Sequence, residues 1–287
     1  MSPQLRPRLR RGALLTLVPL GLLVLGACSE EQKTQFKRLA QPVGASDRAP
    51  AMHSLWMWSW LAAILVGLLV WGLIFYASVR FRRRSDDEIP VQVRYNLPIE
   101  ILYTIAPVVI VVVLFYHTVK TQDETLKPVA HPDHVVDVVG QQWSWTFNYV
   151  KDKDLNGSTT VWDAGTTAYE PTLVLPVNES VTFNLSSPDV IHSFWVPAFL
   201  FKMDVIPGRD NHFSLTPTRK GWYLGRCAEL CGVYHSRMLF RLHVVDSAQY
   251  ATYLQSLQAQ GNTGLNLGGS HDRHQVGLHT NENGAGQ

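Results

Sequence analysis

The sequence predicts a two-helix membrane anchor followed by an all-β domain of sandwich or barrel type. Two apolar runs, Leu55–Ser78 and Ile99–Val119, are each long enough to cross a bilayer. From His134 to Val245 the chain shows short β-rich runs broken by turn residues, and several of them alternate apolar and polar side chains. Nearly all the strongly apolar segments therefore lie before residue 120, and an ordinary globular mixture follows.

The N-terminus has the pattern of an export signal. Four arginines without an acidic residue precede an apolar stretch over residues 12–25. That stretch ends in Leu25-Gly-Ala-Cys28, which resembles a bacterial lipoprotein box, in which the cysteine is lipidated and becomes the mature N-terminus. The alternative is an ordinary signal peptide with an incidental cysteine. We predict a lipoprotein signal at 1–28 with lipidation at Cys28, and an external segment at 29–54.

The two apolar runs and the charges between them predict a multi-pass anchor over residues 55–119. At ~1.5 Å per residue the first run covers ~36 Å, enough for a bilayer core with some tilt. Tryptophans gather at its leading edge and arginines follow it, which places its far end in the cytoplasm (Trp56, Trp58 and Trp60; Arg80, Arg82, Arg83 and Arg84). The second run returns outward, so everything beyond Lys120 faces the outside. Two buried core helices would be shorter and would not show this arginine asymmetry.

Short strands fill the predicted domain over residues 120–257. Examples of the β-rich runs are His134–Val139, Trp143–Val150, Thr172–Pro176, Ser180–Leu185, His212–Thr216, Trp222–Arg226 and Met238–Val245. Their number and spacing predict an antiparallel sandwich or small barrel. One helix is predicted after Asp246, with apolar residues at helical spacing (Tyr250, Tyr253, Leu254 and Leu257). Residues 258–287, rich in Gly, Asn and Gln, are predicted to be a disordered tail rather than a metal site, although they contain His271, His274 and His279.

Charge narrows the choice of partners. The whole chain of 287 residues has a net charge of only +2, but residues 121–260 hold fourteen Asp and Glu against ten Lys and Arg, which makes that segment −4. A mildly acidic domain argues against a nucleic acid as partner and is compatible with a basic protein docking on it. Three cysteines are too few for a disulfide scaffold.

One short segment carries most of the candidate chemistry. The run Cys227-Ala-Glu-Leu-Cys231-Gly-Val-Tyr-His235-Ser-Arg-Met238 places two thiols, an imidazole and a thioether in a loop between two predicted strands. A further histidine, His192, lies upstream. Thiolate and thioether ligands select soft metals, and copper above all when histidines complete the set.

Three other interpretations of this segment explain fewer of its residues. A disulfide is the ordinary state of two cysteines in an exported domain, but it leaves His235 and Met238 without a role. Structural zinc suits the spacing of the two cysteines, but the second histidine pair is absent. A single blue-copper centre needs one cysteine rather than two. The loop by itself therefore favours a two-copper site.

The same residues resemble subunit II of cytochrome c oxidase, over roughly residues 50 to 255. The resemblance rests on Cys-x3-Cys-x3-His-x2-Met with His-Ser and Trp-Val-Pro upstream, on Asp204-Val-Ile-Pro-Gly-Arg209, on the aromatic segment from Gly140 to Tyr149, and on the paired spans. It implies a cupredoxin-like Greek-key domain on the outer face of a bacterial plasma membrane, with oxidase subunits I and III and cytochrome c as partners. Oxygen would be reduced to water in subunit I, with proton translocation.

The resemblance also implies a role for each matching residue. Cys227 and Cys231 would bridge two copper ions, the centre known as CuA, and His192 and His235 would bind one copper each. Met238 and the backbone carbonyl of Glu229 would be the weaker ligands, and the Glu229 side chain would reach a magnesium ion shared with subunit I. The centre would take electrons from cytochrome c and pass them to haem in subunit I.

Two residues outside the loop receive functional roles from the same resemblance. Trp143 matches the tryptophan at which electrons enter, and is expected to lie over the copper at the exposed surface. It could also be a packing residue of the sheet. Glu100, in the first turn of the second span, matches the glutamate at the mouth of a proton path. A solvated interfacial glutamate is the alternative, since a carboxylate there is costly unless it is useful.

Three related proteins are weighed against this interpretation. Subunit II of quinol oxidases is also a two-span lipoprotein but lacks the copper ligands, which this chain retains. A copper-storage or delivery lipoprotein would need neither two spans nor the Trp143 segment. Nitrous-oxide reductase shares the copper loop but not the anchor.

Overall fold

The computed structural model describes residues 29–85, 87–89 and 91–268. The predicted signal peptide with Cys28 and the tail histidines therefore lie outside the described residues. The chain divides into two units, residues 1–43 and 44–287. In the first, helix α2 (Glu30–Lys37) begins with a capping box, in which Ser29 Oγ accepts from Gln32 N (3.2 Å) and Gln32 Oε1 accepts from Ser29 N (2.9 Å).

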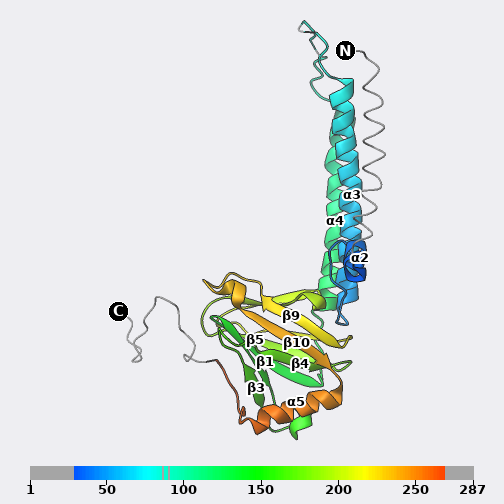
Figure 1. Cartoon of the computed structure of the whole chain (residues 1–287). Coiled ribbons are helices and arrows are strands. Elements are labelled where there is room, and N and C mark those ends of the chain that lie inside the picture. Colours follow the sequence, from blue (N-terminus) through cyan, green and yellow to red (C-terminus); the bar gives the residue numbers. More distant parts are fainter. Residues whose placement is uncertain (1–28, 86, 90, 269–287) are drawn as a thin grey trace. The chain divides into compact units, whose positions relative to one another are not determined.

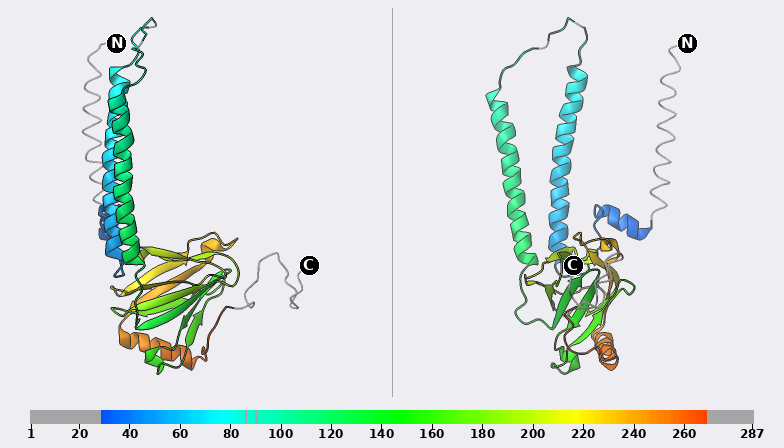
Figure 2. Two further views of the ribbon diagram at one scale, coloured as in Figure 1. Left: turned by 180° about the vertical axis from the view of Figure 1, so that it is seen from behind. Right: turned by 90° about the vertical axis from the view of Figure 1, so that its left-hand side faces the viewer.

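Two long helices open the second unit. Helix α3 (Ala49–Arg80) and helix α4 (Leu97–Thr125) contain the two predicted spans, and both are long and apolar enough to cross a membrane. Their apolar side chains are exposed along most of their length, which leaves a surface suited to lipid or to partner helices. The residues lining the groove between them come from the N-terminal half of α3 and the C-terminal half of α4, and the helices splay apart beyond it (Figure 2).

In the described part of the chain, ten strands form two five-stranded sheets (Figure 1). The first sheet has the order β3-β2-β1-β5-β8, with β1 (His134–Gln141), β2 (Ser144–Tyr149), β3 (Val161–Ala164), β5 (Val181–Ser186) and β8 (Asn211–Leu215). The second has the order β4-β10-β9-β6-β7, with β4 (Thr172–Pro176), β6 (His192–Val196), β7 (Phe201–Val205), β9 (Gly221–Cys227) and β10 (Leu239–Val245). Three short 3-10 turns, Lys153–Leu155, Pro197–Phe199 and His235–Arg237, and helix α5 (Ser247–Ala259) complete the domain.

The sandwich is a mixed one, and this corrects the expectation of a purely antiparallel fold. Strand β1 pairs with β5 in parallel, and β10 pairs with β4 in parallel, while the other pairs are antiparallel. Each parallel pair joins strands that are separated in sequence by a long connection, which parallel pairing requires. Alternation within a strand reveals which face is buried, but it does not reveal which neighbour the strand takes.

Aromatic side chains from both sheets form the core. Phe194 of β6 contacts Trp145 of β2 and Phe183 of β5 at ring-centroid distances of 5.8 Å, and Phe240 of β10 contacts Phe147 of β2 at 5.2 Å. Rings at these separations combine a large buried apolar area with favourable edge and offset contacts. The layer lies next to the segments that carry the candidate ligands, because the Trp145 ring is 6.2 Å from that of His192 and its Nε1–H donates to the carbonyl of Met238 (3.3 Å).

The segment after α5 corrects another expectation. Residues 262–268 lie against the first sheet instead of starting a disordered tail. Thr263 forms a bridge with Val161, and Asn148 donates from Nδ2 to the carbonyl of Asn266 (2.9 Å) while its Oδ1 accepts from Asn266 N (2.7 Å). The backbone of a polar, Gly-rich segment thus finds partners on β2 and β3, and composition alone does not show this.

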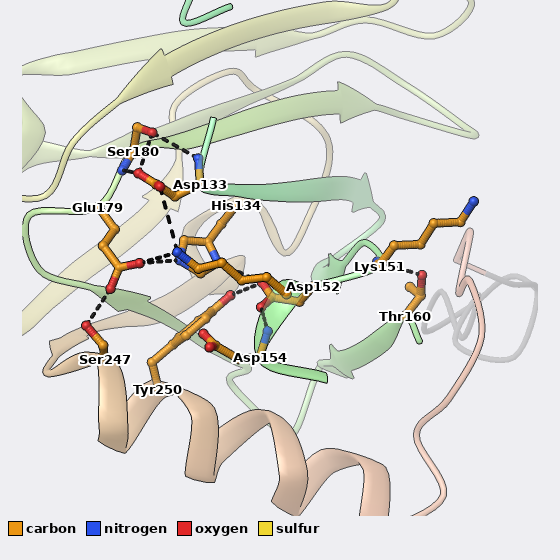
Figure 3. A network of polar contacts seen from close by, with 11 residues as sticks. Asp133, His134, Lys151, Asp152, Asp154, Thr160, Glu179, Ser180, Ser247 and Tyr250 are labelled. Atoms are coloured by element: carbon orange, nitrogen blue, oxygen red, sulfur yellow. Dashed lines mark hydrogen bonds and ion pairs between the residues drawn. The ribbon is translucent and has the colours of Figure 1, made fainter. Parts of the chain in front are cut away.

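A buried polar network joins α5 to the start of β1 (Figure 3). The His134 ring lies between two carboxylates, with Nδ1 at 2.8 Å from Asp152 Oδ2 and Nε2 at 3.1 Å from Glu179 Oε2. Tyr250 of α5 donates to the same Asp152 oxygen (2.7 Å). The side chains of His134 and Asp152 are completely buried.

The network predicts a specific pH dependence of stability. Burial lowers the pKa of His134, but the hydrogen bonds to Asp152 and Glu179 raise it more, so the net shift is upward. Burial raises the pKa of Asp152, and the contact with His134 lowers it more. A histidine with a raised pKa adds stability below its unfolded pKa of about 6.5, and that stability is lost as the pH rises through the folded pKa. The carboxylate with a lowered pKa adds stability above about pH 4, which is lost on acidification.

We therefore expect His134→Gln to destabilise the chain by about 3 kcal/mol near pH 5–6, because it leaves the buried Asp152 carboxylate without its cation. The difference from wild type should shrink towards pH 9. Thermal unfolding of the full chain in detergent across this pH range measures the effect, and the exposed His131→Gln variant is the control. A difference that is independent of pH would show that His134 acts only through packing.

Candidate metal centre

Three segments meet at one end of the sandwich. The first residue of β6 is His192, and the loop between β9 and β10 carries Cys231. Strands β6 and β9 pair through Phe194 and Cys227, so the start of one ligand segment lies beside the end of the other. The turn between β1 and β2 supplies the third segment, Gln142 and Trp143. The hydrogen bonding of the second sheet thus brings together residues that are 35 positions apart in the chain.

The two thiols lie at the centre of this cluster. Their Sγ atoms are 3.9 Å apart, both cysteines are only 4% exposed, and no disulfide joins them. The Nδ1 atom of His192 lies 3.8 Å from Cys227 Sγ, and Nδ1 of His235 lies 3.5 Å from Cys231 Sγ. Each sulfur therefore has one imidazole nitrogen beside it.

The weaker predicted ligands lie in the same cluster. Met238 Sδ is 3.7 Å from Cys231 Sγ, and the backbone oxygen of Glu229 accepts a hydrogen bond from Cys227 Sγ (3.2 Å). Met238 is fully buried, whereas the Glu229 side chain is exposed. All six residues predicted as ligands are thus brought to one place by the fold, with the atoms that the resemblance assigns to binding directed inward.

The pKa values of the two thiols are shifted in opposite directions. The contact with Cys231 lowers the pKa of the Cys227 thiol to about 3, with a further lowering from His192. The same contact, together with burial, raises the pKa of Cys231. One thiol therefore ionises readily while the second keeps its proton, and a cation between the sulfurs would favour loss of that second proton.

Asp189 contacts the His192 ring at Nε2, the nitrogen that does not face Cys227. Its Oδ1 lies 2.9 Å from His192 Nε2 and accepts from Val190 N (2.6 Å), while its Oδ2 accepts from Gln142 N (2.7 Å). Burial raises the pKa of Asp189, but these hydrogen bonds lower it more, so it is held as a carboxylate. With Nε2–H donated to Asp189, the free lone pair of His192 is on Nδ1, which faces Cys227.

The β1–β2 turn also holds the cysteine loop. The carbonyl of Cys231 accepts from Gln142 Nε2 (2.7 Å) and from Trp143 Nε1 (3.1 Å). The Trp143 ring lies against Gly232, where a Cβ atom would approach the indole to 2.9 Å. Gly232 also has φ +125°, so both the backbone and the space require glycine there.

Trp143 does not lie exposed, which corrects the expectation from the resemblance. Its side chain is only 2% exposed, because Gly232 and the ring of Tyr234 cover it. The hydrogen bond to Cys231 shows that the residue takes part in holding the ligand loop. Its proximity to the cluster agrees with the expected location beside the copper loops.

The other predicted site residues are placed as follows. Glu100 accepts from Asn96 N (2.8 Å) while Asn96 caps Ile99 N (3.4 Å), so the carboxylate completes the N-terminal cap of α4. This cap gives a structural reason for the carboxylate within an apolar segment. The position that would be lipidated, Cys28, lies outside the described residues.

Sequence reasoning missed Asp189, Gln142 and Tyr234. A signal for Asp189 was available, because an aspartate three residues before a candidate histidine ligand is well placed to receive its second ring N–H. Gln142 and Tyr234 gave no comparable signal, since their contacts join the β1–β2 turn to a loop about 90 residues away.

The donor set fits a soft, redox-active metal. The ligand atoms of His192, Cys227 and Cys231 lie within 4.8 Å of one another and are buried, and two sulfurs with imidazole neighbours match the preference of copper. A cupredoxin-like β-sandwich with such a cluster, joined to two apolar helices of membrane-spanning length, defines a membrane-anchored copper protein.

Comparison with known proteins places the chain more closely. The model of the cytochrome c oxidase subunit II periplasmic domain matches residues 134–245, and that of the subunit II transmembrane domain matches residues 35–120. A probable cytochrome c oxidase subunit 2 from Streptomyces coelicolor is 45% identical over 92% of this chain and 91% of its own length. The subunit 2 of Corynebacterium glutamicum is 35% identical over 88% of this chain and 87% of its own.

Among solved structures, the periplasmic domain of subunit II from Bradyrhizobium japonicum is 28% identical, with a TM-score of 0.41, over 46% of this chain and 99% of that one. The identities over nearly the full length of the relatives decide the assignment. The chain belongs to the cytochrome c oxidase subunit II family. It is thus a membrane subunit of an electron-transporting oxidase complex, with an extracellular domain and a family-specific copper centre.

Proposed function

We propose that the six converging residues hold a dinuclear copper centre that accepts electrons from cytochrome c and passes them to haem in subunit I. The observation that carries the proposal is the cluster of two thiols 3.9 Å apart, each with an imidazole nitrogen within 3.8 Å. When bound, a copper pair supplies reversible one-electron oxidation and reduction. Cys227 and Cys231 would bridge it, His192 and His235 would complete the strong set, and Met238 and the Glu229 carbonyl would be the outer ligands.

The chain's own residues provide what rapid electron transfer needs. The ligand loops are fixed by hydrogen bonds to the β1–β2 turn and lie on a close-packed aromatic layer, so the ligands have little freedom to move when the charge changes. Burial of the cysteines excludes water from the sulfurs. Asp189 holds the His192 proton on Nε2, so that no proton transfer is required when Nδ1 binds.

The test uses the full chain purified in detergent. We expect two copper ions per chain, a delocalised mixed-valence EPR signal, and bleaching of that signal on addition of ferrocytochrome c. Preferential binding of zinc, or one copper per chain, would rule out the dinuclear centre. An intact copper signal that ferrocytochrome c does not bleach would reject this donor and retain the metal site.

Three further roles belong to the same proposal. The exposed Glu229 carboxylate would bind the magnesium shared with subunit I, and Glu229→Ala should remove the EPR signal of manganese substituted there.

Glu100 would lie at the mouth of a proton path, and Glu100→Gln, which keeps an oxygen for the cap, should slow proton uptake by the oxidase. Subunit III would join subunit I as a partner in the complex.

The chain's processing and topology are proposed on the sequence alone. Residues 1–27 would be removed and Cys28 lipidated, which the intact mass of the mature chain would show. The arginines after α3 would then face the cytoplasm, and both described spans would cross the plasma membrane. Protease protection of the loop between α3 and α4 in sealed vesicles tests this orientation.

A further inference from the structure

The tryptophan expected to receive electrons is enclosed by its own chain. The Trp143 ring is 2% exposed, with Gly232 against its face and its Nε1–H donated to the carbonyl of Cys231 (3.1 Å). A donor that meets this surface therefore cannot stack on the indole. The ring is well connected inward to a ligand residue, but it needs an outer contact.

Tyr234 supplies that outer contact. Its ring meets the Trp143 ring edge to face, at a centroid distance of 5.1 Å and an interplanar angle of 88°. Tyr234 is partly exposed, and the preceding Val233 is 77% exposed. The Arg237 guanidinium lies 5.6 Å from the Tyr234 ring centroid, which holds the ring by a cation–π contact.

The aliphatic side chains exposed near the cluster do not offer such a route, and the partly exposed His235 ring, 3.5 Å from Cys231 Sγ, is itself one of the predicted ligands. Ile191 is 45% exposed beside His192, but its side chain is aliphatic and the His192 ring is completely buried. Leu230 is 79% exposed beside Cys231 and is also aliphatic. Among the described residues around the ligand loops, Tyr234 is the aromatic ring that both reaches the surface and touches Trp143.

We propose that Tyr234 is the outer member of a two-ring electron entrance, and that the haem edge of the donor contacts Tyr234 rather than Trp143. This inference rests on the proposed function. One electron leaves the donor, whose haem iron passes from ferrous to ferric, and the copper centre gains that electron through Tyr234, Trp143 and the Cys231 backbone. Both rings begin and end the transfer neutral, and no proton moves.

Paired variants of the full chain separate this role from a structural one. Tyr234→Leu should slow the oxidation of ferrocytochrome c about tenfold below saturation, the effect of losing one central aromatic contact at an interface. Tyr234→Phe, which keeps the ring, should remain near the wild-type rate. Reduction by hexaammineruthenium(II), a small reductant, should be unchanged, as should copper content and the EPR spectrum. Tyr169→Leu, at a tyrosine that is 52% exposed elsewhere on the domain, is the control.

A second measurement does not depend on turnover or on the variants holding copper. N-acetylimidazole should acetylate Tyr234 of the wild-type chain, and bound ferricytochrome c should protect it while leaving Tyr169 reactive. Wild-type rates in Tyr234→Leu, or acetylation of Tyr234 that cytochrome c does not reduce, would overturn the inference. If Trp143→Phe slows the donor and Tyr234→Leu does not, the inference alone fails. If ferrocytochrome c does not reduce even the wild-type centre, cytochrome c is rejected as the donor, and that part of the proposed function fails.

Discussion

Cys227→Ser is expected to abolish the copper centre. The Cys227 sulfur lies within 3.9 Å of His192 Nδ1, Glu229 O and Cys231 Sγ, so it is the shared contact of the cluster. A serine hydroxyl is shorter, harder and rarely ionised, and it cannot bridge two soft metal ions. We expect the bound copper to fall below one per chain and the mixed-valence EPR signal to disappear.

Metal analysis and EPR of the purified full chain measure this result. Cys28→Ser, which removes the third cysteine of the sequence, should leave both readouts unchanged. The far-ultraviolet circular dichroism of Cys227→Ser should match wild type, because the aromatic layer beneath the loop is untouched. Two coppers with an unaltered spectrum in Cys227→Ser would contradict the proposed bridging role.

Asp189→Asn is expected to weaken copper binding about 10- to 100-fold, the usual effect of removing a group that orients a metal-binding histidine. Both carboxylate oxygens of Asp189 are used, one facing His192 Nε2 and the other accepting from Gln142 N. An asparagine has one acceptor oxygen, and its amide cannot accept from either donor. Asp189→Asn therefore weakens either the contact with the His192 ring or the contact with the β1–β2 turn.

Competition with a copper chelator measures the affinity of the full chain. The exposed Asp204→Asn, which removes the same charge from β7, is the matched control and should bind copper as wild type does. An unchanged affinity in Asp189→Asn would mean that packing alone orients the His192 ring. An equal loss in both variants would instead point to the net charge of the domain.

Much of this molecule follows from local sequence. The spans follow from uninterrupted apolar runs, and the β-sandwich follows from short alternating segments. Most of the ligands follow from one loop, because Cys227, Cys231, His235 and Met238 are close in the chain. Their donor atoms lie close together in the structure, as the spacing indicates. Such features depend on periodicity and spacing over a few residues, which a single sequence displays.

Three of the strands are absent from the segments that the sequence analysis names as β-rich. Strand β3 has only four residues and β6 lies between Pro188 and Pro197, whereas β7 alternates apolar and polar residues over its five positions, which is a local strand signal. All three are paired with neighbouring strands in the two sheets. The omission of β6 matters most, because its pairing with β9 brings His192 to the cysteine loop.

The sequence by itself determined the membrane anchor, the all-β domain and the identity of the ligand loop. Only the tertiary structure decided that Trp143 is enclosed, that Tyr234 covers it, and that Asp189 and Gln142 tie two ligand segments to one turn. The physical reason is that these contacts join segments 47 to 91 residues apart, so they depend on strand register and packing. No periodicity within a segment encodes these contacts, whereas the kinds of ligand atom in the loop follow directly from its residue types.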